Sequence, residues 1–323
     1  MTLIGVEGHL ITVQVDVSSG LPSWDIVGLP DISIKESKQR VRAALKNIGV
    51  TMPSRKIIIN LAPANIKKEG PFYDLPIAIG LLCDLNIISV QDLSSSVFIG
   101  ELSLDGTLNR INGVLPMCIE AFNLGIKKAF VPYENRLEAG IVNGLEIYPV
   151  KSLLDLIGHL NGKKQIEKFQ SNINEIFESN NYYNLDYIDV KGQENIKRAL
   201  EIAAAGAHNC LLIGSPGSGK TMMARRLPSI LPNLTFEEAL EITKIHSIAG
   251  TLPPSSSLIT SRPFRAPHHT ISKSALVGGG KYPKPRRNEF ITLWSFIFRW
   301  NSWIQTRNFR SYACSSWRFK SYH

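Results

Sequence analysis

The residues best suited to chemistry lie in one short glycine-rich stretch in the second half of the chain. It reads Gly214, Ser215, Pro216, Gly217, Ser218, Gly219, Lys220 and Thr221, which satisfies the spacing G-x-x-x-x-G-K-[ST] in full. Glycines allow the backbone to turn so that its N–H groups point inward at phosphate oxygens. Lys220 would reach the β- and γ-phosphates of a nucleotide, and the Thr221 hydroxyl would take one position on Mg²⁺. We therefore expect these eight residues to bind ATP, with Thr221 as the protein ligand of the metal.

The flanking sequence predicts the strand and the helix that such a loop needs. Residues 209–213 form a continuous apolar run, typical of a strand in a parallel sheet that is covered on both faces. Residues 222–231 are expected to form a helix, so that the positive N-terminal end of the helix faces the same anion. Apolar residues at helical spacing indicate another helix within 191–206. The alternative is a glycine-rich turn that merely links a strand to a helix, but such a turn would not require Lys220 and Thr221.

The first half of the chain predicts an α/β domain. Apolar and polar residues alternate over 3–17, as in strands with one buried face. Asp31 is expected to cap a helix that runs to about Asn47 and ends at Gly49. The other expected elements are a strand at 56–61, a helix at 75–82, a strand at 97–104 before a reversal at Asp105 and Gly106, a helix at 115–123, a strand at 128–131 and a helix at 150–160. Residues 161–184 are polar and rich in asparagine, and we interpret them as a linker.

Around the glycine-rich loop the sequence resembles the YifB/ComM family of magnesium-chelatase-like AAA+ ATPases. The resemblance is carried by residues 190–194, 224–232, 234–240, 262–272 and 278–280. It implies an oligomeric ATPase, a hexamer in intact members, that uses ATP and Mg²⁺ and acts on DNA as a branch-migration motor in recombination or natural transformation. His268 and His269 lie within this resemblance; adjacent side chains on an extended strand point in opposite directions and rarely chelate one ion, so a structural role is favoured over a metal site.

The N-terminal domain resembles the proteolytic domain of Lon, as reused in YifB-like proteins. The likeness is carried by residues 20–29, 60–80 and 99–132. It places a catalytic Ser and Lys at two positions where this chain has Phe72, after the turn 68–71, and Leu115. Neither side chain can transfer a proton, so we expect a proteolytically inactive scaffold used for assembly or DNA contact. Seven basic residues could contact phosphates, although a merely solvated face is the favoured interpretation: Lys35, Lys38, Arg42, Arg55, Lys56, Lys67 and Lys68.

The resemblance stops after Pro285. In the family, an apolar strand follows that ends in Asp-Glu, where the Asp holds Mg²⁺ and the Glu polarises the attacking water. A sensor residue, an arginine finger and a helical lid come later in the family pattern. This chain has none of these features. Residues 286–323 instead contain seven basic residues against Glu289 alone, and four of the five tryptophans. One hypothesis is a reading-frame change, because favourable codon choices for 296–300 restore Leu-Phe-Leu-Asp-Gly after loss of one base. We thus expect a C-terminally truncated ATPase with no intact catalytic residues, hydrolysis lost and a disordered tail.

Composition agrees with an ordinary soluble protein. The 323 residues suggest two domains, and 44% hydrophobic against 20% charged residues exclude a disordered chain. The four cysteines are far apart, so neither a zinc site nor a disulfide framework is indicated. There is no signal-peptide pattern and no apolar stretch of membrane-spanning length, and we expect a cytoplasmic protein that does not contact membranes.

The expected organisation has four parts. Residues 1–163 form the inactive Lon-like α/β domain, 164–184 the linker, 185–285 the first half of the P-loop AAA+ α/β domain and 286–323 the aberrant basic and aromatic tail. The leading interpretation is an ATP-binding protein, by resemblance a DNA motor of this family, in which ATP hydrolysis is lost. The alternative is a non-enzymatic DNA-binding or assembly module that uses the Lon-like domain and the tail, where aromatic residues among arginines could stack on single-stranded bases.

Overall fold

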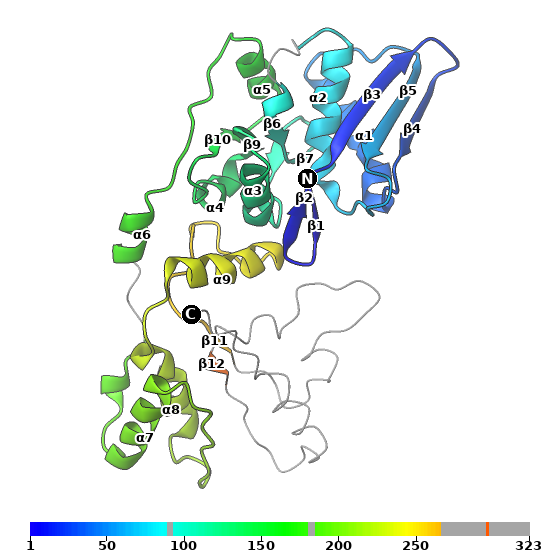
Figure 1. The fold of residues 1–323 in the computed structure, drawn as a ribbon. Coiled ribbons are helices and arrows are strands. Elements are labelled where there is room, and N and C mark those ends of the chain that lie inside the picture. Colours follow the sequence, from blue (N-terminus) through cyan, green and yellow to red (C-terminus); the bar gives the residue numbers. More distant parts are fainter. Residues whose placement is uncertain (89–92, 180–184, 266–294, 297–323) are drawn as a thin grey trace. The chain divides into compact units, whose positions relative to one another are not determined.

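Two units make up the fold. The computed structural model describes residues 1–88, 93–179, 185–265 and 295–296 (Figure 1). The first unit comprises Met1–Ile173 and His246–Ser257, and the second comprises Asn174–Ile245 and the chain from Leu258 onward. Residues 164–173 and 246–257 thus pack with the first unit, and the four expected domain boundaries stay a prediction.

A mixed three-stranded sheet forms the first layer of unit one. Its order is β3 (Thr12–Ser18), β5 (Lys56–Ala62) and β4 (Ser23–Val27), with β5 antiparallel to β3 and parallel to β4. The alternation in β5 buries Ile57, Ile59 and Leu61 on one face, as expected of a strand with one covered side. Helix α2 (Asp74–Asp84) packs on β3, and α1 (Ile32–Asn47) packs on α2.

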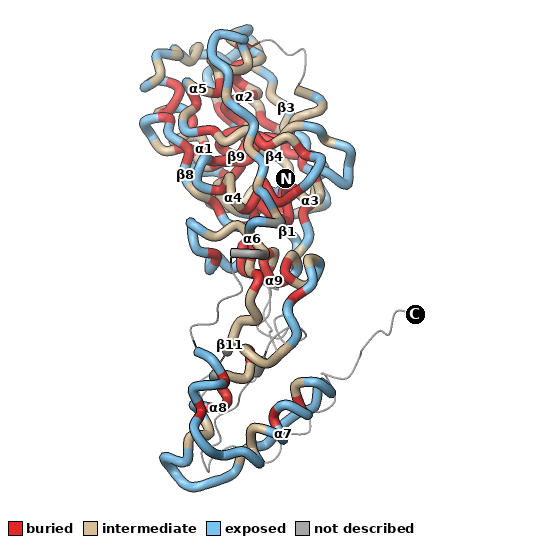
Figure 2. Tube along the Cα trace, turned by 90° about the vertical axis from the view of Figure 1, so that its left-hand side faces the viewer, coloured by how far each residue is buried: buried red, intermediate tan, exposed pale blue. Residues whose placement is uncertain are grey.

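A parallel sheet forms the second layer. Its order is β10 (Glu146–Val150), β9 (Lys128–Pro132) and β6 (Ser96–Phe98). The central strand β9 is buried along most of its length, as the burial-coloured trace shows (Figure 2), which explains its continuous apolar sequence. The remaining elements of this unit are the hairpins β1 (Thr2–Ile4) with β2 (Glu7–His9) and β7 (Glu101–Leu102) with β8 (Leu108–Asn109), the helices α3 (Val114–Asn123), α4 (Arg136–Ala139) and α5 (Leu153–Leu160), and the 3-10 turns η1 (Pro71–Tyr73), η2 (Leu93–Ser95) and η3 (Tyr133–Asn135).

Several expected elements of the first unit are confirmed and others are corrected. Asp31 caps α1 by accepting a hydrogen bond from the Ile34 N–H at 2.8 Å. The strand expected at 97–104 is divided into β6 and β7, because Gly100 leaves the sheet to bond with Phe72 and Leu75. The helix expected at 150–160 begins at Leu153, since Val150 belongs to β10.

The second unit is mainly helical within the described residues. It contains α6 (Ile173–Ser179), η4 (Tyr187–Asp189), α7 (Glu194–Ala205), α8 (Lys220–Arg226), η5 (Leu227–Ile230), most of α9 (Phe236–Ile248) and the short parallel pair β11 (Phe264–Arg265) with β12 (Ser295–Phe296). A small core of Tyr187, Val190, Leu200 and Met223 joins η4, α7 and α8. The helix expected at 222–231 changes to a 3-10 turn after Arg226, because Pro228 has no N–H with which to continue it.

One expectation about this region is wrong. No strand forms at 209–213 in the described part of the chain, and Leu211 and Ile213 are 68% and 87% exposed. A strand needs a neighbour to pair its N–H and C=O groups, and no described strand lies beside this run. Within 164–184, the Phe169 N–H donates to the Ile147 carbonyl and the Ser171 N–H donates to the Gly140 carbonyl, and α6 begins at Ile173. The linker stays a prediction.

Candidate nucleotide-binding loop

The glycine-rich loop adopts a conformation that other residues rarely reach. Gly217 and Gly219 both have φ of 81°, the left-handed region in which a Cβ is strained. A turn is closed by the Ser218 N–H, which donates to the Ser215 carbonyl at 3.3 Å. Residues 214–218 are exposed, so the loop's backbone is open to an incoming ligand.

Lys220 is folded back over this loop. Its ammonium group donates to the carbonyl oxygens of Gly214 at 2.9 Å and Ser215 at 2.7 Å, and to Ser218 Oγ at 3.0 Å. An ammonium has three donors, so the loop itself satisfies all of them. All three acceptors are uncharged oxygens, and the positive charge of Lys220 is therefore held at the loop without being neutralised there.

Helix α8 fixes Lys220 and Thr221 at its start. Met223 and Ala224 are buried at 2% and 3% exposure, and the Met223 N–H donates to Gly219. Thr221 is exposed in the first turn, where its hydroxyl is accessible to a metal ion. The loop is thus anchored on its C-terminal side, while 209–213 on its N-terminal side belongs to no strand.

An arginine that the sequence gave no role holds α8 in place. Arg226 Nε donates to the Asp186 carbonyl at 2.9 Å, and its guanidinium lies 3.3 Å from Asp189 Oδ2. Ser229 adds a bond from the Tyr187 N–H to its Oγ at 3.1 Å. Arg226 could have been noticed only as part of the family resemblance, because its partners lie about forty residues earlier in the chain.

The positions that would carry proteolysis are part of the core. Phe72 is 9% exposed and Leu115 is fully buried, so neither a nucleophile nor a base is present there. Lys68 is also fully buried and donates to the Pro63 carbonyl, and burial lowers the pKa of its amine. For Lys68, both the favoured solvated face and the alternative of a phosphate contact are therefore wrong. Lys67 is engaged with Glu69 at 2.5 Å.

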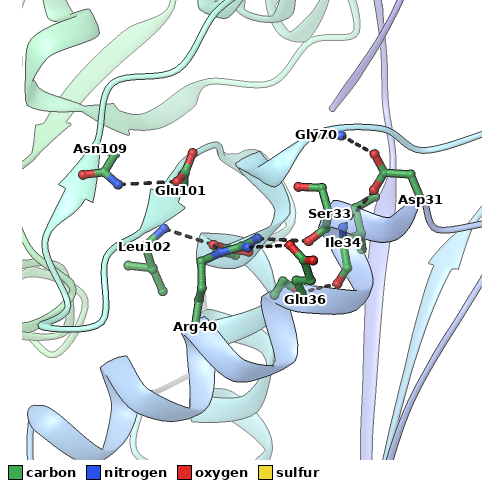
Figure 3. Close-up of polar contacts among 11 residues, drawn as sticks. Asp31, Ser33, Ile34, Glu36, Arg40, Gly70, Glu101, Leu102 and Asn109 are labelled. Carbon is green, nitrogen blue, oxygen red and sulfur yellow. Dashed lines mark hydrogen bonds and ion pairs between the residues drawn. The ribbon is translucent and has the colours of Figure 1, made fainter.

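Buried polar contacts support the turn before Phe72. Figure 3 shows Asp31 accepting from both the Ile34 and Gly70 N–H groups, which ties the start of α1 to this turn. Nearby, the fully buried Asp74 accepts two hydrogen bonds from Arg40, at 2.6 and 3.0 Å. Burial raises the pKa of Asp74, against the opposing effect of Arg40. These contacts are structural, since none presents a reactive group to solvent.

The described residues provide neither a cluster of metal ligands nor a membrane-spanning helix. They contain no group of three or more His, Cys, Asp or Glu side chains that could hold a metal ion, and Cys83, Cys118 and Cys210 are free thiols. No helix in these parts of the chain is both long and apolar enough to cross a bilayer. His268, His269 and, apart from Ser295 and Phe296, the tail 286–323 lie outside the described residues.

Both halves of the chain are similar to known magnesium-chelatase-like proteins. A family model described as subunit ChlI of Mg-chelatase matches residues 13–135, and one described as magnesium chelatase, subunit ChlI, matches 186–289. Competence protein ComM of Haemophilus influenzae is 40% identical over 285 residues, covering 87% of this chain and 55% of that protein. YifB of Escherichia coli is 42% identical over 284 residues, covering 87% and 54%. Lon protease 2 of Bacillus subtilis is 27% identical over 172 residues, covering 48% and 30%.

Fold and loop together define a magnesium-chelatase-like α/β protein with an N-terminal region similar to Lon. The chain belongs to the YifB/ComM family. It spans about half the length of the ComM and YifB relatives that it matches.

Proposed function

We propose that this protein binds Mg²⁺–ATP through residues 214–221. The proposal rests on the position of the Lys220 ammonium group. Three hydrogen bonds to uncharged oxygens hold this group over the loop, and they leave its positive charge without a counter-charge there. Phosphate oxygens are stronger acceptors for an ammonium than carbonyl oxygens, because the bond is assisted by charge on both partners. A bound triphosphate would therefore replace the loop oxygens around Lys220, while Thr221 would ligate Mg²⁺.

Nucleotide titration of the purified chain tests this proposal. Lys220→Ala should weaken ATP binding at least about tenfold, which corresponds to ~1.4 kcal/mol, because charge-assisted hydrogen bonds are lost. Lys191→Ala is the matched control, since Lys191 is an exposed lysine of the same unit and should leave the affinity unchanged. Equal ATP affinity of the Lys220→Ala variant and the unaltered chain, measured by calorimetry, would refute the assignment.

We further propose that the 323 residues alone bind ATP without hydrolysing it at an appreciable rate. Hydrolysis in P-loop enzymes needs an acidic residue for Mg²⁺ and a group that orients water, and the sequence from 286 to 323 contains no Asp-Glu pair. Appreciable release of phosphate from Mg²⁺–ATP by this chain, abolished by Lys220→Ala, would contradict the proposal.

The biological role that we propose is that of the family: an oligomeric, cytoplasmic motor acting on DNA in recombination or natural transformation. The similarity to competence protein ComM supports it. The first unit would serve assembly or DNA contact, and exposed Lys35, Arg42 and Lys46 on α1 are suitable for phosphate contacts. An electrophoretic mobility assay with branched and duplex DNA, and size-exclusion chromatography with and without ATP, test these two parts separately.

A further inference from the structure

The segment that follows helix α9 packs into the first unit around the buried Glu138 carboxylate. Glu138 is 4% exposed and accepts a hydrogen bond from Ser247 Oγ at 2.6 Å. The Asn135 side chain and the Leu115 N–H also donate to it. A buried carboxylate is costly unless it is hydrogen-bonded, so Ser247 supplies a partner that Glu138 needs.

Backbone contacts extend this docking along the segment 246–252. The Gly113 N–H donates to the Ser247 carbonyl at 3.0 Å, which satisfies one of the carbonyl groups that the end of a helix leaves free. Arg110 donates to the Leu252 carbonyl at 2.6 Å, and the Leu252 side chain is 3% exposed. Gly250 lies so close to Asn112 that an added Cβ would be 2.6 Å from its Nδ2.

The receiving surface is itself rigidly built. Asn135 forms a pair of hydrogen bonds with Ile111, accepting from its N–H at 3.1 Å and donating to its carbonyl at 2.8 Å. Residues 110–115, Asn135 and Glu138 together form the docking site for the segment 246–252. The docking site includes Leu115, the position at which the resemblance to Lon places a catalytic lysine. A region that was expected to lack catalytic residues therefore binds another segment of the same chain.

Helix α9 contains residues of both units, so packing of its C-terminal end in the first unit also affects the second. The chain passes between the units at 245–246, within the last turn of the continuous helix Phe236–Ile248. Residues of one helix are linked by successive backbone hydrogen bonds, so order at one end stabilises the next turn more than a loose loop would. We infer that the docking site is a coupling point: holding 246–252 in the first unit sets the stability of the α9 residues that belong to the second unit.

Coupling through α9 requires no bound nucleotide. If the second unit does bind Mg²⁺–ATP, reciprocity of coupled equilibria requires that any effect of the docking site on ATP affinity be matched by an effect of ATP on the docked segment. ATP binding in the second unit would then change the stability of the segment that is held at the docking site in the first unit.

Hydrogen exchange of the full chain, followed by mass spectrometry without nucleotide, tests the coupling. Leu252→Ala should raise exchange at least about tenfold in 246–257 and 110–118, because a buried anchor is removed. It should also raise exchange at least about threefold in 236–245, which belongs to the second unit. Leu154→Ala is the matched control, since Leu154 is a leucine of the same unit that is 60% exposed, and it should change none of these segments.

The outcomes decide between coupling and simple packing. Faster exchange in 246–257 with unchanged exchange in 236–245 would overturn the coupling, and no change in any segment would overturn the docking itself. Should Leu252→Ala unfold the first unit, Ser247→Ala removes only the hydroxyl bond to Glu138 and allows the same comparison. For that variant, a smaller increase in the same three segments supports the inference, and an increase confined to 246–257 overturns it.

Discussion

Lys220 and Lys68 differ in their access to solvent. Lys220 and Lys68 both donate to backbone carbonyls, yet Lys220 lies over an exposed loop while Lys68 is enclosed in the first unit. Only the first can exchange its acceptors for those of a ligand. The lysine of a phosphate loop and a structural lysine are thus distinguished by access to solvent rather than by residue type.

The Arg40–Asp74 pair should be a large contributor to stability. Arg40→Ala would leave the fully buried Asp74 carboxylate without its main partner, and loss of one member of a buried pair costs about 3–5 kcal/mol. We expect a decrease toward the lower end of that range in the free energy of unfolding, measured with urea, because the Arg40 side chain is 21% exposed. Arg42→Ala, on the exposed side of the same helix, should change it by less than about 0.5 kcal/mol. Equal effects of the two substitutions would contradict this account.

Glu138 should make the stability of the protein depend on pH. Burial raises the pKa of Glu138, and hydrogen bonds from Ser247 and Asn135 oppose the shift. The folded state therefore holds the proton more tightly than the unfolded state, where the pKa is about 4.3. Protonated Glu138 therefore contributes fully to the free energy of unfolding below pH ~4.3. This contribution is lost as the pH rises through the raised pKa of Glu138 in the folded state.

Glu138→Gln removes this titration. The free energy of unfolding of the unaltered chain minus that of the variant should fall as pH increases above ~4.3, when both are measured by urea denaturation at a series of pH values. A difference that grows with pH would mean that the hydrogen bonds to the carboxylate outweigh its burial.

Among the elements, α1 shows how one side chain can define a helix end and a tertiary contact together. Asp31 Oδ1 accepts from Ile34, and Oδ2 accepts from Gly70 at 3.1 Å. Asp31→Ala should lower the free energy of unfolding by about 1–2 kcal/mol, since the N-cap bond alone is worth roughly 1 kcal/mol. Asp31→Asn keeps one oxygen acceptor for Ile34 and should recover about half of the loss in the same urea titration. No difference between Ala and the original Asp would show that neither bond contributes.

The segment 209–213 shows that strand formation depends on residues far away in the chain. Its sequence is as apolar as that of β9, but β9 lies between two partner strands and is buried, whereas Leu211 and Ile213 are exposed. Apolar composition therefore identifies a segment able to form a central strand, and pairing determines whether the strand exists.

At the scale of the whole molecule, the charge distribution gives a test of where DNA would bind. Most of the formal charge of +9 lies in residues 286–323, and an accidental basic tail would add only salt-sensitive, non-specific attraction. We expect deletion of 286–323 to leave the affinity for branched DNA unchanged at about 0.2 M salt, a concentration that strongly weakens such attraction. Loss of binding in a fluorescence anisotropy titration at this salt would instead favour the tail as a nucleic-acid site.

The sequence by itself determined the features that depend on residues close together in the chain. The spacing within 214–221, the cap at Asp31, the turn at Asp105 and Gly106, and the replacement of a catalytic pair by Phe72 and Leu115 could all be read directly, because each involves local backbone geometry or residue identity. The eight-residue nucleotide site stays a prediction, although the geometry around Lys220 supports it.

Only the tertiary structure decided the features that depend on segments far apart. It enclosed Lys68, gave 209–213 no partner among the described strands, paired Arg226 with Asp186 and Asp189, and packed 246–252 on the docking site. The physical reason is that burial, strand pairing and the satisfaction of a buried carboxylate are properties of the neighbours that folding brings together, which a pattern along one segment does not contain.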